Sequence, residues 1–152
     1  MFELDARLQA DTVLLGRLPL SQVLLMNDRR YLWVILVPVR PDAREYYHLS
    51  ADDQSQLMKE SSWVAEKLAD NYTADSMNVA ALGNVVPQLH VHHVARHHND
   101  PAWPGPVWGH SPAEPYGVGE LEKRVHELKQ LLASHFVEDV NDDENAENTI
   151  YW

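Results

Sequence analysis

Three side chains that can form hydrogen bonds, two of them imidazoles, recur at every second position: Gln88, His90 and His92. Successive side chains of a β-strand point to opposite sides, so a strand here would carry all three on one face. Neighbours on that face lie roughly 7 Å apart, which lets one imidazole attack a bound atom while the next contacts the departing group. A half-buried surface strand alternates in the same way, so the pattern alone leaves both interpretations open.

Residues on either side of this segment favour an anionic ligand. Gly83 and Asn84 form a turn-prone pair before it, and backbone N–H groups in such a turn can bind an anion. Arg96 follows it with a planar guanidinium that suits a phosphate. Between them, a neutral imidazole can attack phosphorus when its other nitrogen is held by an acceptor, such as a nearby backbone carbonyl.

The run from Gln88 to Val94 resembles the motif of the histidine triad (HIT) family, His-φ-His-φ-His-φ-φ, in which φ is an apolar residue. Gln88 takes the place of the first histidine, and His93 stands at an apolar position. The preceding turn stands where the family has Gly-Gln-Ser-Val, although Val85 lacks the usual hydroxyl. The resemblance extends over about residues 14–108, but the histidine that many members carry after the proline of an early strand is absent here.

The resemblance implies a nucleotide phosphohydrolase or nucleotidyl transferase that acts at an α-phosphate through a covalent nucleotidyl-histidine intermediate, without a cofactor. His90 matches the nucleophile, and His92 would contact the scissile or leaving oxygen. Gln88 can donate a hydrogen bond but cannot shuttle a proton. Activity would be weakened if the first triad position must titrate, whereas Gln88 suffices if that position only orients its neighbours.

The resemblance also implies a set of nucleotide-binding residues. Asn27 matches a position that holds ribose hydroxyls, although its place in a polar turn explains it equally well. The expected phosphate contacts are Gly83, Asn84, Val85 and Arg96. His93 points away from His90, and we expect it to be a partly buried histidine beneath a helix.

Two other functions are compatible with the sequence. A nucleotide-binding protein with little turnover would follow from the loss of the first histidine. A metal site at His90 and His92 would need a third ligand a few residues further on, where the sequence has Val94, Ala95 and Arg96. A cation beside a metal ion is unfavourable, so we predict no required metal.

Length and composition favour one globular domain, predicted over residues 1–137, followed by an acidic, disordered tail over 138–152. The tail holds six of the acidic residues and no Lys or Arg, which leaves 17 acids against 12 bases in the rest. Such an acidic body argues against binding long nucleic acid. The chain has no cysteine, no run long enough to span a membrane and no secretory start, so we expect a cytoplasmic protein.

The patterns predict an α+β fold of the HIT type, with about five antiparallel strands and helices packed on one face. A lead-in over 1–11 precedes the strands, which are expected at 12–17, 21–26, 31–37, 77–82 and 87–95. Helices are expected at 51–69, capped by Ser50, and at 118–136.

Trp103 and Trp108 lie in a Pro- and Gly-rich loop, and each must pack on something. Packing over the sheet or across a dimer interface is the simpler interpretation, and a wall beside the site is the functional one. An open sheet leaves two edges exposed, and members of the family that the motif resembles usually pair through the first long helix and the adjoining strand. We therefore expect a homodimer built on the helical stripe of Leu57, Ser61, Val64 and Leu68.

Overall fold

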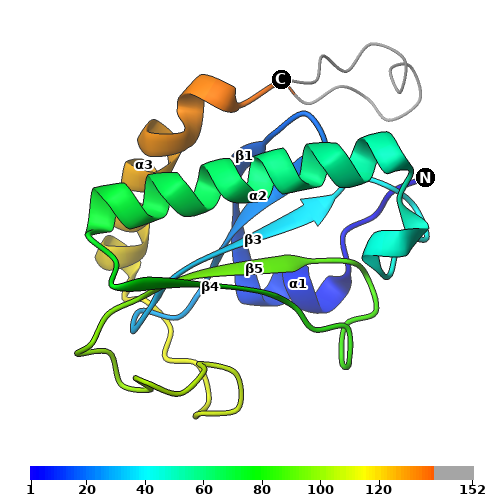
Figure 1. Ribbon diagram of the computed structural model, residues 1–152. Coiled ribbons are helices and arrows are strands. Elements are labelled where there is room, and N and C mark those ends of the chain that lie inside the picture. Colours follow the sequence, from blue (N-terminus) through cyan, green and yellow to red (C-terminus); the bar gives the residue numbers. More distant parts are fainter. Residues whose placement is uncertain (139–152) are drawn as a thin grey trace.

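The computed structural model describes residues 1–138, which form one five-stranded antiparallel sheet. The strand order is β1-β2-β3-β5-β4, so the last two strands in sequence sit beside the third in reversed order (Figure 1). The strands are β1 (Thr12–Arg17), β2 (Ser21–Met26), β3 (Leu32–Pro38), β4 (Ser76–Ala81) and β5 (Val91–Arg96). The predicted tail falls outside the described residues from position 139 onward.

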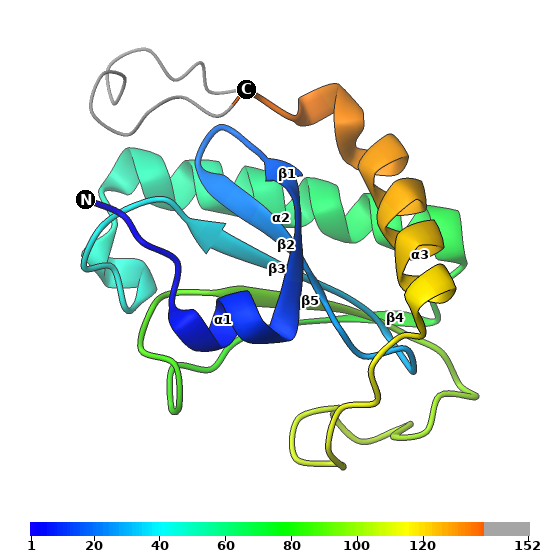
Figure 2. The same cartoon turned by 180° about the vertical axis from the view of Figure 1, so that it is seen from behind.

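Helices cover both faces of the sheet unequally. The long helices α2 (Ala51–Tyr72) and α3 (Val118–Leu132) pack on one face, and the short α1 (Ala6–Asp11) lies on the other (Figures 1 and 2). Two 3₁₀ turns, η1 (Tyr46–His48) and η2 (Ala133–His135), flank them. The predicted α+β fold, with a five-stranded antiparallel sheet and its main helices on one face, is confirmed.

Local signals at both ends set the length of α2. The Ser50 side chain accepts a hydrogen bond from the Asp53 backbone N–H, which caps the first turn. Thr73 then adopts a left-handed conformation with φ of 51°, and its N–H bonds back to the Ala69 carbonyl. The helix therefore runs to Tyr72, three residues beyond the predicted end.

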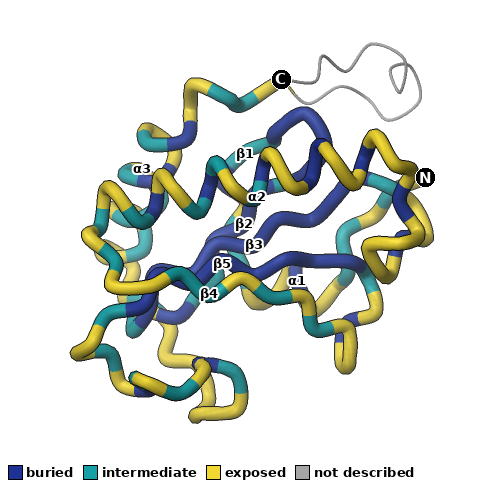
Figure 3. Tube along the Cα trace, in the orientation of Figure 1, coloured by how far each residue is buried: buried dark blue, intermediate teal, exposed yellow. Residues whose placement is uncertain are grey.

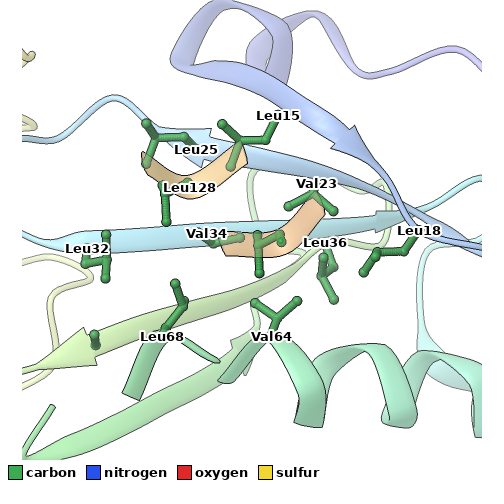
Figure 4. Close-up of a cluster of buried hydrophobic side chains, with 12 residues drawn as sticks. Leu15, Leu18, Val23, Leu25, Leu32, Val34, Leu36, Val64, Leu68 and Leu128 are labelled. Atoms are coloured by element: carbon green, nitrogen blue, oxygen red, sulfur yellow. The ribbon is translucent and has the colours of Figure 1, made fainter. Parts of the chain in front are cut away.

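The core between the sheet and the long helices consists of aliphatic side chains that alternate along the strands (Figure 4). Val34 on β3 is completely buried there, as are Val64 and Leu68 on α2 and Leu128 on α3. The stripe on α2 thus packs on its own sheet, and its Ser61 hydroxyl contacts His93. The expected homodimer contact through this stripe is therefore wrong, because the stripe is already buried within one chain.

The opposite face of the sheet carries Trp33 and Ile35 of β3 and His92 of β5. We call it the site face, because His92 belongs to the motif. This face is covered by an apolar cluster, which includes Leu8 of α1 and Val107 of the loop after β5. Strand β3 is consequently buried on both sides along its whole length, and Figure 3 shows β3 and β5 as the buried centre of the molecule. No helix in the described part of the chain is long and apolar enough to cross a membrane.

The strand that carries the motif is shorter than predicted. It begins at Val91, where it pairs with Ala81 of β4, so Gln88 and His90 precede it. Pro87 has no N–H to offer a neighbouring strand, and the Leu89 N–H donates to the Ala43 carbonyl instead. The predicted start of this strand at residue 87 is therefore wrong, although the rings of His90 and His92 still lie beside each other, with centroids 4.9 Å apart.

Candidate active site

His90 is held by the backbone immediately before it. Its side chain is 5% exposed, and its Nδ1 lies 2.7 Å from the carbonyl oxygen of Gln88. A carbonyl oxygen only accepts hydrogen bonds, so Nδ1 must carry the proton that is donated. In the neutral ring, Nε2 then holds a lone pair, which is the state that a nitrogen nucleophile needs.

His92 is held in the opposite tautomer by a side chain from the neighbouring strand. The indole Nε1 of Trp33 donates to Nδ1 of His92 across 2.9 Å. Indole N–H is a donor only, so Nδ1 is the acceptor and the proton of the neutral ring sits on Nε2. Burial, followed by repulsion from His90 and His93, lowers the pKa of His92 from 6.5 to about 3, which keeps the ring neutral near pH 7.

The two imidazoles therefore carry different groups at Nε2. Their ring centroids are 4.9 Å apart, and the planes meet at 72°. His90 has a lone pair at that nitrogen, whereas His92 has an N–H. The pair can thus supply a nucleophile and a hydrogen-bond donor from two adjacent side chains that are almost completely buried.

Two tryptophans enclose His92 on the site face. Trp33 and Trp108 contact its ring edge-on, with centroids 5.6 Å and 5.4 Å away, and they contact each other at 6.0 Å. Trp108 therefore packs over the sheet and also forms a wall beside the candidate site, which unites the two sequence-based interpretations. Trp103 lies elsewhere, against His98.

Gln88 uses its side chain to hold the N-terminal segment, residues 1–5. Its Oε1 accepts from the Asp5 N–H at 2.9 Å, and its Nε2 donates to the Glu3 carbonyl at 2.9 Å. Phe2 and Leu4 of this segment join the apolar cluster on the site face. Both ends of the amide are therefore engaged by backbone, while the Gln88 carbonyl holds His90.

Arg96 is not placed to bind phosphate, contrary to the sequence-based prediction. It is 1% exposed, and it donates to both carboxylate oxygens of Asp100 and to Oδ1 of Asn78. Burial alone would raise the pKa of Asp100, but hydrogen bonds from Arg96 and from backbone N–H groups lower it to about 2. The guanidinium anchors the loop after β5, because Asp100, four residues further on in that loop, neutralises it.

The other predicted nucleotide-binding residues lie at the surface or at its margin. Gly83, Asn84 and Val85 form an exposed turn after β4, next to Val86, which is buried on the site face. Asn27 follows β2, and its Oδ1 accepts the N–H of Tyr116. This bond uses the acceptor of Asn27 in the structure of a turn and leaves its amide N–H groups for a ligand.

His93 lies on the far side of β5 from His92. It is completely buried beneath α2, and its Nε2 is 2.7 Å from the Ser61 hydroxyl. Burial lowers its pKa to about 4. The expectation of a histidine buried under a helix is met, although the burial is complete rather than partial.

Trp33 is the one site residue that sequence reasoning missed. The pairing of Trp33 with Val94 and of Ile35 with His92 makes Trp33 a diagonal neighbour of His92 across the two strands. A sequence signal existed, because Trp33 lies in an uninterrupted apolar segment that is predicted to form a central strand. The spacing of residues did not predict which strand would pair with the strand of Trp33. Within residues 1–138, no group of three or more His, Cys, Asp or Glu side chains could hold a metal ion.

Comparison with known proteins supports one family. Residues 7–99 match the family model described as the HIT domain. A histidine triad protein from Marinobacter aquaeolei VT8 is 49% identical, with a TM-score of 0.86, over 89% of this chain and 98% of that one. Histidine triad proteins from Sinorhizobium meliloti 1021 and Bradyrhizobium japonicum are each 43% identical over 90% of this chain and 98% of theirs, with TM-scores of 0.81 and 0.82.

A comparison with curated proteins finds no match. The family model nevertheless covers more than half of the chain, and the solved relatives share its fold over nearly their whole length. The chain therefore belongs to the HIT domain family, whose members are generally nucleotide hydrolases and transferases.

Proposed function

We propose that this protein is a nucleotidyl hydrolase or transferase that acts at an α-phosphate through a covalent intermediate on His90. The observation that carries the proposal is the opposite tautomers of His90 and His92, which lie side by side. One nitrogen lone pair and one N–H, close together and shielded from water, suit attack on phosphorus with stabilisation of the oxygen that departs.

In the first step the Nε2 lone pair of His90 forms a bond to the α-phosphorus, and the bond from phosphorus to the leaving oxygen breaks. The leaving oxygen keeps that electron pair. The imidazole becomes cationic as the bond forms, and the Gln88 carbonyl that accepts its Nδ1–H favours this charge. Water, or the hydroxyl of another acceptor in a transferase, then attacks the phosphorus and releases its proton to the solvent, and the P–N electron pair returns to His90.

His92 acts in this scheme as a neutral donor. Because its pKa is lowered to about 3, its Nε2–H forms a hydrogen bond to an oxygen that gains negative charge, without first holding an extra proton. Gln88 acts as an orienting residue, since both ends of its amide are engaged and neither can titrate. This assignment favours the second of the two roles left open for the first triad position.

The nucleotide would bind between the exposed turn of Gly83, Asn84 and Val85 and the amide of Asn27. The substrate is thus a small nucleotide-containing molecule. A purified-protein panel of nucleoside phosphoramidates, dinucleoside polyphosphates and adenylylated compounds tests the class. Intact mass spectrometry after acid-free quenching should then show one nucleotidyl group on the wild type and none on His90→Ala. If the protein turns over none of the compounds in the panel, the proposal is wrong.

A nucleotide-binding protein with little turnover is the second candidate, because Gln88 stands in place of the first triad histidine and cannot shuttle a proton. Equilibrium binding measured beside turnover separates the two. Micromolar binding of a nucleotide without product formation on any panel member would support it. A metal site is disfavoured by geometry, because the Nε2 of His92 carries a proton and its Nδ1 is occupied by Trp33.

We also propose that the chain forms a homodimer, but through a different surface from the stripe on α2. Strand β4 is an edge of the sheet, with Val79 47% exposed, and Met58 on the neighbouring α2 is 64% exposed. An unpaired edge with apolar side chains favours pairing with a second copy. A monomeric mass by light scattering at micromolar concentration would contradict it. A cytoplasmic location stays a prediction from sequence.

A further inference from the structure

We propose that Trp33 is a positioning residue that holds His92 as its neutral Nε2–H tautomer and thereby makes the two imidazoles complementary. This inference rests on the proposed function and assigns a role to a residue outside the motif. Within the motif, the Gln88 carbonyl fixes the tautomer of His90, whereas the group that bonds Nδ1 of His92 comes from outside it.

The contact between Trp33 and His92 is short, buried and directional. Both side chains are almost completely buried, at 6% and 7% exposed, and the N–H of one points to the lone pair of the other at 2.9 Å. The rings meet at 60°, so the contact is edge-on and not a stack. The indole N–H of Trp33 can only donate, so Nδ1 of His92 must accept. The neutral ring of His92 therefore carries its proton on Nε2.

No other described side chain replaces this donor. Trp108 also packs against His92, but its own Nε1 is buried without a hydrogen-bond partner among residues 1–138. Without the indole N–H of Trp33, the Nδ1 of His92 would be an unpaired acceptor in a dry site. With that bond gone, no partner would hold the proton on Nε2, and the ring would populate both neutral tautomers.

The Nδ1–H tautomer would change the chemistry. With the proton on Nδ1, His92 would present a lone pair at Nε2, beside the lone pair of His90. Two lone pairs facing an anionic phosphate oxygen repel it, and the departing oxygen loses its donor. Trp33 therefore acts through His92 and does not need to touch the substrate.

The first test measures the tautomer without any substrate. Imidazole ¹⁵N NMR on the wild type should assign the proton of His92 to Nε2, and Trp33→Phe should move it to Nδ1 or give a mixture. Tyr31→Phe is the matched control, since Tyr31 is a buried aromatic residue on the same face that packs edge-on against Trp33. It should leave the His92 signals unchanged. An Nε2–H tautomer that persists in Trp33→Phe overturns the proposal.

A second variant guards against a folding failure of Trp33→Phe. Benzothienylalanine at position 33 replaces the indole N–H by sulfur and keeps the bicyclic shape. It should shift the tautomer as Trp33→Phe does, while its far-UV circular dichroism matches the wild type. A folded protein with unchanged His92 signals would again overturn the proposal.

The last test is a double-mutant cycle on the best substrate. We expect Trp33→Phe to lower kcat about tenfold in the wild type, the scale of one lost hydrogen bond, and less than about twofold in a His92→Ala background. Equal losses in both backgrounds would show that Trp33 does not act through His92. If no substrate is found, the proposed function fails, yet the NMR result still decides the tautomer.

Discussion

His92 and His93 are adjacent in sequence, and both are buried, yet the two faces of β5 give them different chemistry. Burial lowers both pKa values, to about 3 and about 4, so each ring stays neutral near pH 7. His92 accepts from an indole and lies beside a second imidazole, whereas His93 meets a hydroxyl beneath α2. A perturbed pKa alone therefore does not mark a functional histidine, and the partners on its face do.

The largest expected effect lies on the site face, at His90, the proposed nucleophile. His90→Ala should lower turnover by a factor of about 10³ or more, because no other lone pair replaces its Nε2. His90→Gly should regain part of the rate when free imidazole is added. The matched change on the other face, His93→Gln, keeps a polar atom near Ser61 and should stay within about fivefold of the wild type. Initial rates on the best panel substrate decide this, and full activity in His90→Ala would refute the assignment.

The next effect separates the two nitrogens of His92. His92→Asn keeps an acceptor near Nδ1 for Trp33 but has nothing at Nε2, so kcat should fall about 10²-fold. His92→Gln reaches the position of Nε2 with an amide N–H and should lose only about tenfold. Steady-state kinetics on both variants provide the measurement. A smaller loss of kcat in His92→Asn than in His92→Gln would mean that Nδ1, and not Nε2, donates to the substrate.

His92 and His93, on the two faces of β5, should contribute alike to the pH dependence of the free energy of unfolding. The unfolded histidines bind protons below pH 6.5, whereas the folded ones do so only near pH 3 to 4, so the free energy of unfolding falls as the pH drops through this window. Each imidazole should contribute a loss on the order of 3 kcal/mol by pH 4. Glu60 opposes it, because burial raises the pKa of this carboxyl and the folded chain takes up its proton first.

Urea unfolding at several pH values from 7 to 4 measures this dependence. His92→Asn and His93→Gln should each flatten the curve by a similar amount, while His110→Ala, which changes an exposed loop residue, should not. A curve that flattens for only one of the two variants would show that their environments differ energetically as well as chemically.

The smallest effect is expected at Gln88, on the site face but outside the reacting pair. Gln88→Ala removes two partly exposed hydrogen bonds to the N-terminal segment and should cost about 1–2 kcal/mol of stability. Amide exchange at Asp5 should speed up, and kcat should fall severalfold. Gln88→His, which restores the family motif, should not raise kcat. A tenfold gain would instead show that the first position has to titrate.

The helices and strands could be predicted from sequence because they depend on local spacing, whereas the reacting pair was predicted from the resemblance of residues 88–94 to the histidine triad motif. Alternation places His92 and His93 on opposite faces of any strand, and helical periodicity located α2 and α3 to within a few residues. The predictions are wrong where one contact with another part of the chain decides the role of a residue. Arg96 is predicted to bind phosphate, but Asp100 neutralises it. The α2 stripe was read as a dimer contact, but it covers its own sheet.

The sequence by itself determined which residues are candidates for the chemistry, since the resemblance to the histidine triad motif depends only on residue type and spacing within residues 88–94. Only the tertiary structure decided what state they are in. The proton of His92 is placed by Trp33, 59 positions away in sequence, and Gln88 is occupied by backbone 83 to 85 positions away. Such contacts depend on which strands pair and on what covers the sheet. Hydrogen-bond partners set tautomers over about 3 Å, and sequence spacing carries no information at that scale between distant segments.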